Sequence, residues 1–441
     1  MKYCLLGRDE SHAYILDRLK AEGHEVLLLA RTKTGAWEGL LERAASLQVV
    51  RDWKPDIIII DSTGFGPIAK TLADEGFKVF GGSNLQDSLQ KDYLFGLGVL
   101  EAAGVPTCEH SRFTALEDAV DYLQTKDQAW AMRTSDGMVS NFPSTIALQL
   151  HLEKCYQDGE VPANFALQRG FPDNVDGGIA LNPMYYLVGL FNSQGLMQPC
   201  FKMTTAHNLL PSGQGIPTYE GVNLQSIPIQ DEKIASTLKK LQPTLKTVNY
   251  TGWVWVGCTD EWDKKKNEYC TRAMDFRVSP PDGFWAALLG GLQMSVEHFF
   301  GRVLSPRKTD HANTPFEFTP GVVVSRKLTL PPYPLTEAPW LEPKERTRLR
   351  STTPDVCVPR TPGVFWSDVA AGEGGCLQVT GPVVGYATGN GASSGEALRD
   401  LGRAVQMLKI PYLQVKCEDG LECLHLDLLP SPNGKLVGGK V

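Results

Sequence analysis

Polar and glycine-rich turns follow two strands of a predicted parallel sheet, at the points where those strands end. Asp61-Ser62-Thr63-Gly64 comes directly after the apolar run at 57–60, and Gly81-Gly82-Ser83 follows the run that ends at Phe80. The carboxyl ends of parallel strands form the edge at which ligands bind. Backbone amides of a glycine-rich turn can also cradle an anion. These turns therefore predict a ligand crevice at this edge of the sheet.

Strands and helices must alternate through residues 1–87 to place those turns together. Apolar runs at 2–7, 24–30, 56–61 and 77–82 predict strands, and amphipathic stretches at 12–23, 37–47 and 67–76 predict helices. Continuous apolar strands separated by amphipathic helices are typical of a parallel sheet covered on both faces. The first turn, Gly7 to His12, lacks the G-x-G-x-x-G fingerprint of dinucleotide binding. The unit is therefore Rossmann-like without that fingerprint.

The remainder of the chain mixes helices with strands of antiparallel type. Its pattern predicts helices at 88–104, 232–245, 284–303 and 393–408, with strands at 129–133, 164–170, 184–191, 199–203, 250–258, 269–277, 363–369, 376–388, 412–417 and 424–429. The stretch 328–363 is rich in proline and charge, which predicts an extended arm. The predicted fold class is α/β together with α+β.

Composition excludes several classes of function. Lys+Arg 43 against Asp+Glu 50 makes the chain mildly acidic without a basic block, which argues against nucleic-acid binding. The longest apolar runs have the length of strands, so no membrane span is expected. The ten cysteines form no C-x-x-C motif, which favours reduced thiols and a cytoplasmic location over disulfides or metal sites.

This order of elements is similar to the ATP-grasp superfamily, and within it the chain resembles phosphoribosylamine–glycine ligase. The segments that carry the resemblance are Phe77-Lys78-Val79-Phe80-Gly81, Ala103-Gly104-Val105-Pro106-Thr107, the pair His207 and Pro217, Tyr250-Thr251-Gly252, Gly321-Val322-Val323-Val324 and the segment 381–405. The resemblance implies three parts. Residues 1–87 form a Rossmann-like pre-ATP-grasp domain, 88–318 the ATP-grasp domain with two α+β subdomains, and 319–441 a β-rich C-terminal domain with the arm 328–363.

The resemblance also implies ATP and Mg²⁺ as cofactors, and it assigns phosphate contacts to Lys91 and Arg133. Alternatively, Lys91 is a solvent-exposed lysine of a helix, and Arg133 is a structural ion-pair partner. The family's glycine-rich phosphate loop corresponds here to Gly137–Pro143, where one glycine and a proline stand. Proline lacks an amide donor and bulky side chains keep the backbone from approaching a phosphate. Gln168 and Gly170 correspond to the hinge that binds adenine.

The family's metal-binding strand, E-x-N-x-R, corresponds to Ala273-Met274-Asp275-Phe276-Arg277. The first carboxylate is lost, Asp275 becomes the candidate metal ligand, and Arg277 is a candidate catalytic residue. Asp275 and Arg277 alternate on one strand, so a salt bridge between them is the alternative. His207 is the second candidate catalytic residue, or a loop histidine that caps the backbone. The family's charges between His207 and Pro217 are replaced here by neutral residues.

Three hypotheses of function follow. In the first, the chain is an ATP-dependent carboxylate–amine ligase that forms an amide through an acyl phosphate. Its small-molecule substrates would be an amine and a carboxylate, such as the phosphoribosylamine and glycine of purine biosynthesis. In the second, it is a catalytically degenerate module that binds a nucleotide or metabolite. In the third, it is an assembly module, which the arm and the exposed aromatics expected at Tyr333, Trp340 and Trp366 would favour.

Overall fold

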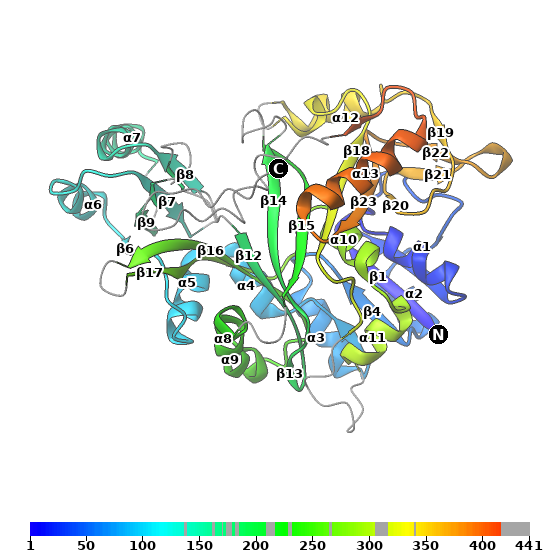
Figure 1. Cartoon of the computed structure of the whole chain (residues 1–441), viewed down its shortest axis with the longest axis horizontal. Coiled ribbons are helices and arrows are strands. Elements are labelled where there is room, and N and C mark those ends of the chain that lie inside the picture. Colours follow the sequence, from blue (N-terminus) through cyan, green and yellow to red (C-terminus); the bar gives the residue numbers. More distant parts are fainter. Residues whose placement is uncertain are drawn as a thin grey trace.

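The computed structural model describes residues 1–135, 139–160, 164–169, 171–172, 179–180, 185–208, 217–227, 232–263, 267–304, 316–338 and 341–415. Figure 1 shows the N-terminal parallel sheet, a small antiparallel sheet set apart from it, and a long antiparallel sheet between them. Among these residues no helix is long and apolar enough to cross a membrane.

The first unit is a parallel sheet with the strand order β3-β2-β1-β4-β5. Its strands are β1 (Lys2–Gly7), β2 (Glu25–Ala30), β3 (Glu42–Arg43), β4 (Ile57–Ile60) and β5 (Val79–Phe80), and its helices are α1 (Tyr14–Ala21), α2 (Leu47–Trp53), α3 (Gly66–Asp74) and α4 (Asn84–Lys91). Alternate residues of β1 pack into different hydrophobic cores, one on each face of the sheet. Tyr3 and Leu5 pack with α1, whereas Cys4 and Leu6 pack with α2 and α3. Both faces are buried, as the apolar runs predicted.

A small antiparallel sheet with the order β6-β9-β7-β8 forms the second unit. It consists of β6 (His110–Phe113), β7 (Trp130–Thr134), β8 (Val139–Phe142) and β9 (Phe165–Arg169), and α6 (Leu116–Leu123) and α7 (Thr145–Asp158) accompany it. Trp130, Met132, Phe165 and Leu167 pack against these helices. The intervening residues Arg133 and Gln168 therefore face the opposite way, toward the rest of the protein.

The largest sheet has ten strands, in the order β17-β16-β12-β14-β15-β18-β23-β20 with β13 and β24 beside them. Their bounds are β12 (Tyr185–Asn192), β13 (Gly195–Leu196), β14 (Cys200–Asn208), β15 (Pro217–Ile227), β16 (Gly252–Asp263), β17 (Glu268–Arg277), β18 (Val322–Thr329), β20 (Val364–Trp366), β23 (Val383–Gly391) and β24 (Gln414–Val415). Strand β15 pairs with β18 from Gly221↔Arg326 to Gln225↔Val322. One sheet thus continues across residue 318, where the sequence places a domain boundary.

The remaining elements are α5 (Tyr93–Ala102), α8 (Glu232–Lys240), α9 (Gln242–Thr247), α10 (Phe284–Gly291), α11 (Val296–Leu304), α12 (Pro343–Arg350), α13 (Ser394–Leu408), β10 (Phe171–Pro172), β11 (Ile179–Ala180), β19 (Cys357–Val358), β21 (Val369–Ala371), β22 (Leu377–Val379) and the short 3₁₀ turns Leu335–Glu337 and Glu373–Gly375. Several of these elements pack on the largest sheet, among them α5, α8, α10, α11 and α13. Strands β19, β22 and β21 form a separate three-stranded sheet.

Three predicted helices are corrected. The stretch 37–47 contains turns and β3 instead of a helix, and α2 begins only after Ser46, whose hydroxyl accepts a hydrogen bond from Val49 N–H. The helix expected at 88–104 is divided at Asp92, which caps α5 by accepting from Phe95 N–H. The helix expected at 284–303 is two helices, because Leu292 leaves the helix to bridge Phe318 and Ser295 caps α11 through His298 N–H.

Two further expectations are wrong in the C-terminal third. The arm 328–363 contains α12 and β19, and Tyr333 and Trp366, expected to be exposed, are 4% and 3% exposed. Trp340 lies outside the described residues. Cys357 and Cys376 form a disulfide, whereas reduced thiols were expected throughout. The bond joins β19 to the start of β22, two segments that the sequence separates by 19 residues.

Candidate active site

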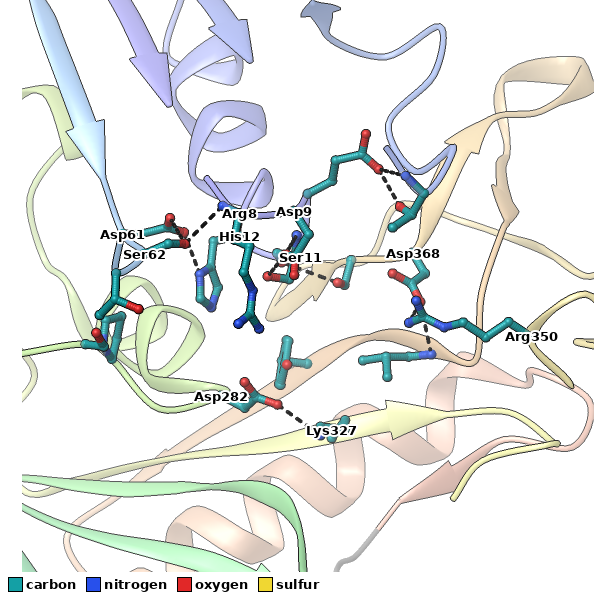
Figure 2. A pocket seen from close by; sticks show the side chains of 18 residues that line it. Arg8, Asp9, Ser11, His12, Asp61, Ser62, Asp282, Lys327, Arg350 and Asp368 are labelled. Atoms are coloured by element: carbon teal, nitrogen blue, oxygen red, sulfur yellow. Dashed lines mark hydrogen bonds and ion pairs between the residues drawn. The ribbon is translucent and has the colours of Figure 1, made fainter. Parts of the chain in front are cut away.

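A pocket of about 340 Å³ lies at the carboxyl ends of β1 and β4. Its other walls come from the loop after β17 and from the C-terminal third of the chain. Its lining includes Arg8, Asp9, Glu10, Ser11, His12, Thr34, Asp61, Ser62, Thr63, Ser279, Pro280, Asp282, Lys327, Arg350, Ser367, Asp368, Val383 and Tyr386. Figure 2 shows charged side chains pointing into it from every wall. We call it the charged pocket.

The turn between β1 and α1 supplies one wall of the charged pocket. Oδ1 of Asp9 accepts hydrogen bonds from the backbone N–H and the hydroxyl of Ser11, at 3.0 and 2.6 Å, which closes the turn. Burial would raise the pKa of the Asp9 carboxyl, but these bonds from Ser11, with the charges of His12 and Arg8, hold it below its ordinary value. Asp9 is thus anionic at neutral pH.

His12 and Asp61 form a buried pair across the ends of β1 and β4. His12 Nδ1 lies 2.6 Å from Asp61 Oδ2, and the side chains are 11% and 4% exposed. Asp61 Oδ1 accepts from the Ser62 hydroxyl at 2.9 Å. Burial alone would lower the pKa of His12, but the charge of Asp61 and its hydrogen bond raise it above the ordinary value, helped by Asp282 and Asp9. Asp61 therefore fixes the orientation of the imidazole.

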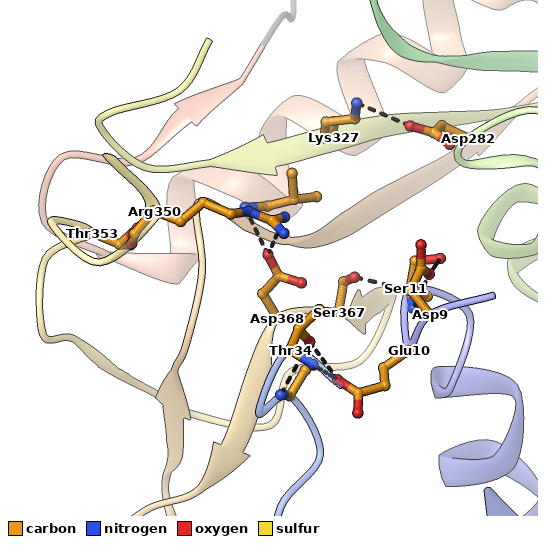
Figure 3. A network of polar contacts seen from close by, with 12 residues as sticks. Asp9, Glu10, Ser11, Thr34, Asp282, Lys327, Arg350, Thr353, Ser367 and Asp368 are labelled. Atoms are coloured by element: carbon orange, nitrogen blue, oxygen red, sulfur yellow. Dashed lines mark hydrogen bonds and ion pairs between the residues drawn. The ribbon is translucent and has the colours of Figure 1, made fainter. Parts of the chain in front are cut away.

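Two ion pairs complete the opposite walls. Lys327 on β18 is 3% exposed and its Nζ lies 3.1 Å from Asp282 Oδ2. Arg350, the last residue of α12, lies 3.4 Å from Asp368 Oδ2. Figure 3 shows that the network continues to the first unit, where the Ser367 hydroxyl donates to the backbone carbonyl of Ser11 at 3.3 Å. The first unit and the C-terminal third of the chain therefore enclose the pocket together.

Strand β17 connects the charged pocket to the predicted metal-binding positions. Asp275 and Arg277 are on this strand, and Ser279, Pro280 and Asp282 of the pocket follow in the next few residues. The Cα atoms of Arg277 and Ser279 are at most about 7 Å apart, because two extended residues reach no further. A group held near Arg277 would thus lie close to a pocket wall.

Asp275 and Arg277 form an ion pair through Oδ2 and Nε. Asp275 is buried and Arg277 is exposed. No three His, Cys, Asp or Glu side chains are grouped to hold a metal within the described part of the chain. Mg²⁺ usually keeps several waters and uses only one or two carboxylates with substrate phosphates. One carboxylate at Asp275 is compatible with one Mg²⁺ held together with nucleotide phosphates, whereas Ala273 offers no oxygen ligand at its position of the strand.

Arg133 and Gln168 are brought together as diagonal neighbours on β7 and β9, whose register pairs Arg133 with Ala166 and Gln168 with Ala131. Arg133 Nε donates to Gln168 Oε1 at 2.8 Å, and the guanidinium lies 4.6 Å from the centre of the Tyr93 ring. Arg133 is 1% and Gln168 0% exposed. The Tyr93 hydroxyl in turn donates to the backbone carbonyl of Met274 on β17. These contacts join the small sheet to the strand that carries Asp275.

The other predicted site residues are less closely placed. Lys91 is exposed at the last position of α4. His207 lies on β14, and only its backbone is among the described atoms. Gly170 lies outside the described residues, as do Gly137 and Met138 of the expected phosphate loop.

The turn at Gly81 to Ser83 does not form the expected anion cradle. Gly81 N–H donates to Thr251 O, and Gly82 N–H donates to Gln86 Oε1 at 2.8 Å. Ser83 caps α4 by accepting from Gln86 N–H. The two backbone amides and the Ser83 hydroxyl are thus hydrogen-bonded within the protein. The turn at Asp61, by contrast, lines the charged pocket, so the predicted crevice lies at the expected edge of the sheet.

Several pocket residues were not identified from the sequence. They are Arg8, Asp9, His12, Asp282, Lys327, Arg350 and Asp368. One signal was present for the first three, because the turn Gly7 to His12 ends a strand at the same edge as Asp61. The others have no local signal, since they come together only through long-range pairing.

Known proteins were compared with the chain by sequence and by structure. No protein-family model and no curated protein matches the sequence. The phosphoribosylamine–glycine ligase of Thermotoga maritima is similar in structure, with a TM-score of 0.66 and 15% identity over 95% of this chain and 100% of that one.

Two other solved structures are similar over most of their length. The biotin carboxylase domain of the Hydrogenobacter thermophilus 2-oxoglutarate carboxylase has a TM-score of 0.61 and 12% identity over 94% of this chain and 92% of that one. The N5-carboxyaminoimidazole synthetase of Staphylococcus aureus has a TM-score of 0.56 and 11% identity over 92% and 97%. All three are ATP-grasp proteins. From Rossmann-like unit to C-terminal strands, this chain has the ATP-grasp fold.

Proposed function

We propose that this protein is an ATP-dependent carboxylate–amine ligase that forms an amide through an acyl phosphate. One observation carries the proposal: β17 holds Asp275 and Arg277 and then runs directly into the wall of the charged pocket. A ligase of this type must hold the γ-phosphoryl group of ATP beside the carboxylate that it activates. The strand places candidate groups for both tasks within a few residues.

The charged pocket has the properties of a small-substrate site. It is concave, lies at the ligand-binding edge of a parallel sheet, and presents both carboxylates and cations. Asp275 would hold Mg²⁺, which neutralises phosphate charge when bound, and Arg277 would contact the transferred phosphoryl group. Similarity to the phosphoribosylamine–glycine ligase supports phosphoribosylamine and glycine as first substrates to test.

Binding and turnover test this proposal in sequence. ATP with Mg²⁺ at about 100 times its dissociation constant should stabilise the protein by about 2.7 kcal/mol. Phosphate release should then depend on both a carboxylate and an amine, tested first with glycine and phosphoribosylamine. Absence of any stabilisation at millimolar Mg·ATP would reject the ligase.

A second function is favoured by the buried state of Arg133 and by Ala273. Arg133 contacts Gln168 and Tyr93 instead of an open cleft, and Ala273 provides no second metal ligand. These features suit a module that binds a nucleotide or metabolite without ligation. Stabilisation by Mg·ATP without phosphate release, across panels of carboxylates and amines, would establish this second function in place of the first.

A further inference from the structure

An amine that attacks an acyl phosphate must first lose a proton. An ordinary primary amine is an ammonium ion at neutral pH, and its nitrogen then has no lone pair to form the new bond. A ligase that uses the charged pocket for its amine therefore needs a proton acceptor in the pocket wall.

The carboxylates of the lining are poorly suited to accept that proton. Asp282 is paired with Lys327, Asp368 with Arg350, and Asp9 accepts two hydrogen bonds from Ser11. Glu10 is likewise engaged, by Thr34 and by Arg43. A carboxylate is a weak base at neutral pH, and each of these four is already held by the partner named.

The cations and the tyrosine of the lining are excluded by their own acid–base chemistry. Arg8, Lys327 and Arg350 offer hydrogen-bond donors and no acceptor. Burial raises the pKa of the Tyr386 hydroxyl well above its ordinary value, so it stays protonated as well. The Ser and Thr hydroxyls of the lining are far weaker bases than an imidazole, so among the lining residues His12 alone is a base that exchanges a proton near physiological pH.

The geometry of His12 suits this role. Its Nδ1 is committed to Asp61 Oδ2 at 2.6 Å, which places the Nδ1 proton in that bond and leaves the lone pair of the neutral ring on Nε2. The side chain lines the charged pocket and remains 11% exposed. Figure 2 shows the ring between Asp61 and the side chain of Arg8, facing the space in front of Asp282.

We propose that His12 is the general base of the ligation step and that Asp61 is its positioning residue. His12 Nε2 removes a proton from the ammonium group of the substrate. The free amine then attacks the acyl carbon, the C–N bond forms, and the C–O bond to phosphate breaks with its electron pair leaving on phosphate. The second proton on nitrogen is lost to that phosphate. This inference rests on the ligase function proposed above.

The charges around His12 tune its basicity. Asp61 faces it from β4, Asp9 and Arg8 from the turn after β1, and Asp282 from the loop after β17. Tyr14 of α1 contacts the ring edge-on, with 5.9 Å between ring centres. The carboxylates outweigh the effect of burial and raise the pKa of His12, which strengthens it as a base.

Hydroxylamine provides the decisive test, because it is largely unprotonated at neutral pH and needs no base to attack an acyl phosphate. With Mg·ATP and a panel of carboxylic acids that begins with glycine, the wild type should give a hydroxamate. With the same acid and a panel of primary amines that begins with phosphoribosylamine, it should give an amide. His12→Gln should keep hydroxamate formation within a few-fold and lose amide formation by about 10²- to 10⁴-fold.

Each outcome has a distinct meaning. No hydroxamate from the wild type would reject the ligase function and the base with it. Equal amide formation by wild type and His12→Gln would overturn the base alone, and so would loss of both products in a folded variant. The exposed His298→Gln serves as the matched control and should change neither product.

Asp61→Asn tests the positioning role through the pH profile. The variant removes the negative charge that raises the pKa of His12 but keeps a hydrogen-bond acceptor. The acid limb of amide formation should therefore move to lower pH, with hydroxamate formation unchanged. A fall in rate without any shift of this limb would contradict the assignment of Asp61.

Discussion

Arg133 of β7 lies over the ring of Tyr93 of α5, with 4.6 Å between the guanidinium carbon and the ring centre. The sequence suggested two roles for Arg133, a phosphate contact or a structural partner. Its near-complete burial and its bond to Gln168 make it part of the packing between the small sheet and helix α5. A phosphate could reach it only if these contacts opened.

Arg133→Gln should therefore lower the free energy of unfolding by about 2–4 kcal/mol, through loss of a buried cation–π contact and a charged hydrogen bond. Urea denaturation measures this change. Arg112→Gln is the control, since its pair with Glu101 is about four-tenths exposed on each side and should contribute at most about 1 kcal/mol. Equal effects of the two variants would contradict the packing role.

Asp275→Asn should reduce ATP-dependent phosphate release by about 100-fold or more, because a metal-bound carboxylate supplies several kcal/mol of charge stabilisation. A phosphate-release assay with Mg·ATP measures it. Glu268→Gln is a matched control, since Glu268 lies exposed on the same strand. Unchanged turnover in Asp275→Asn, together with lower stability, would assign Asp275 to the ion pair with Arg277 alone.

Stability should fall as the pH rises through the neutral range, on account of His12. The folded-state pKa of His12 lies above its ordinary value of 6.5, so protonation favours the folded protein. This contribution is complete below pH 6.5 and is lost as the pH rises through the folded-state pKa. One such group changes the unfolding free energy by at most about 1.4 kcal/mol per pH unit.

Chemical denaturation from pH 6 to 9 compares this slope between variants. His12→Gln should remove the His12 part of the slope, whereas His298→Gln should keep it because that side chain is exposed. Identical slopes in all three proteins would show that His12 is not coupled to folding as the pair with Asp61 requires.

Gly81→Ala should destabilise the edge of the first sheet far more than an ordinary glycine replacement. Gly81 has φ +69°, and a Cβ there would overlap the carbonyl oxygen of Ile60. Gly76 also has a positive φ, +93°, but a Cβ there meets nothing within 4 Å. Gly76→Ala should thus cost about 1–2 kcal/mol, and Gly81→Ala clearly more. Equal melting temperatures would contradict the close approach of β4 and this turn.

Most of the first unit could be predicted from the sequence because its signals are local, whereas β3 lies in a stretch for which the pattern predicts a helix. Each apolar run forms a strand on its own, and short connections leave the parallel order little choice. The break between α10 and α11 depends on the bridge from Leu292 to Phe318, which no local pattern carries. The sequence carries one signal for this break, the helix-capping residue Ser295. That residue lies within an apolar stretch, which favours one continuous helix.

The candidate site, too, could be predicted from the sequence only in part. The sequence identifies Arg133 and Gln168 separately, and they do meet; Tyr93, which the sequence analysis does not single out, lies against Arg133. His12 and Asp61 are 49 residues apart, and Lys327 and Asp282 are 45 apart. Such pairs arise from the packing of distant elements, so the composition of each segment alone says nothing of them.

The continuous sheet from β17 to β20 has a mechanical consequence. Strands β15 and β18 are hydrogen-bonded to each other. Strand β17, which carries Asp275, and β18, which carries Lys327, therefore belong to one continuous sheet. Amide hydrogens in these strands should exchange with solvent together and slowly, as one cooperative unit. Within the residues that the structure describes, the small sheet β6-β9-β7-β8 forms no ladder with these strands. If a nucleotide enters by an opening of the protein, we expect the small sheet to move relative to this continuous sheet.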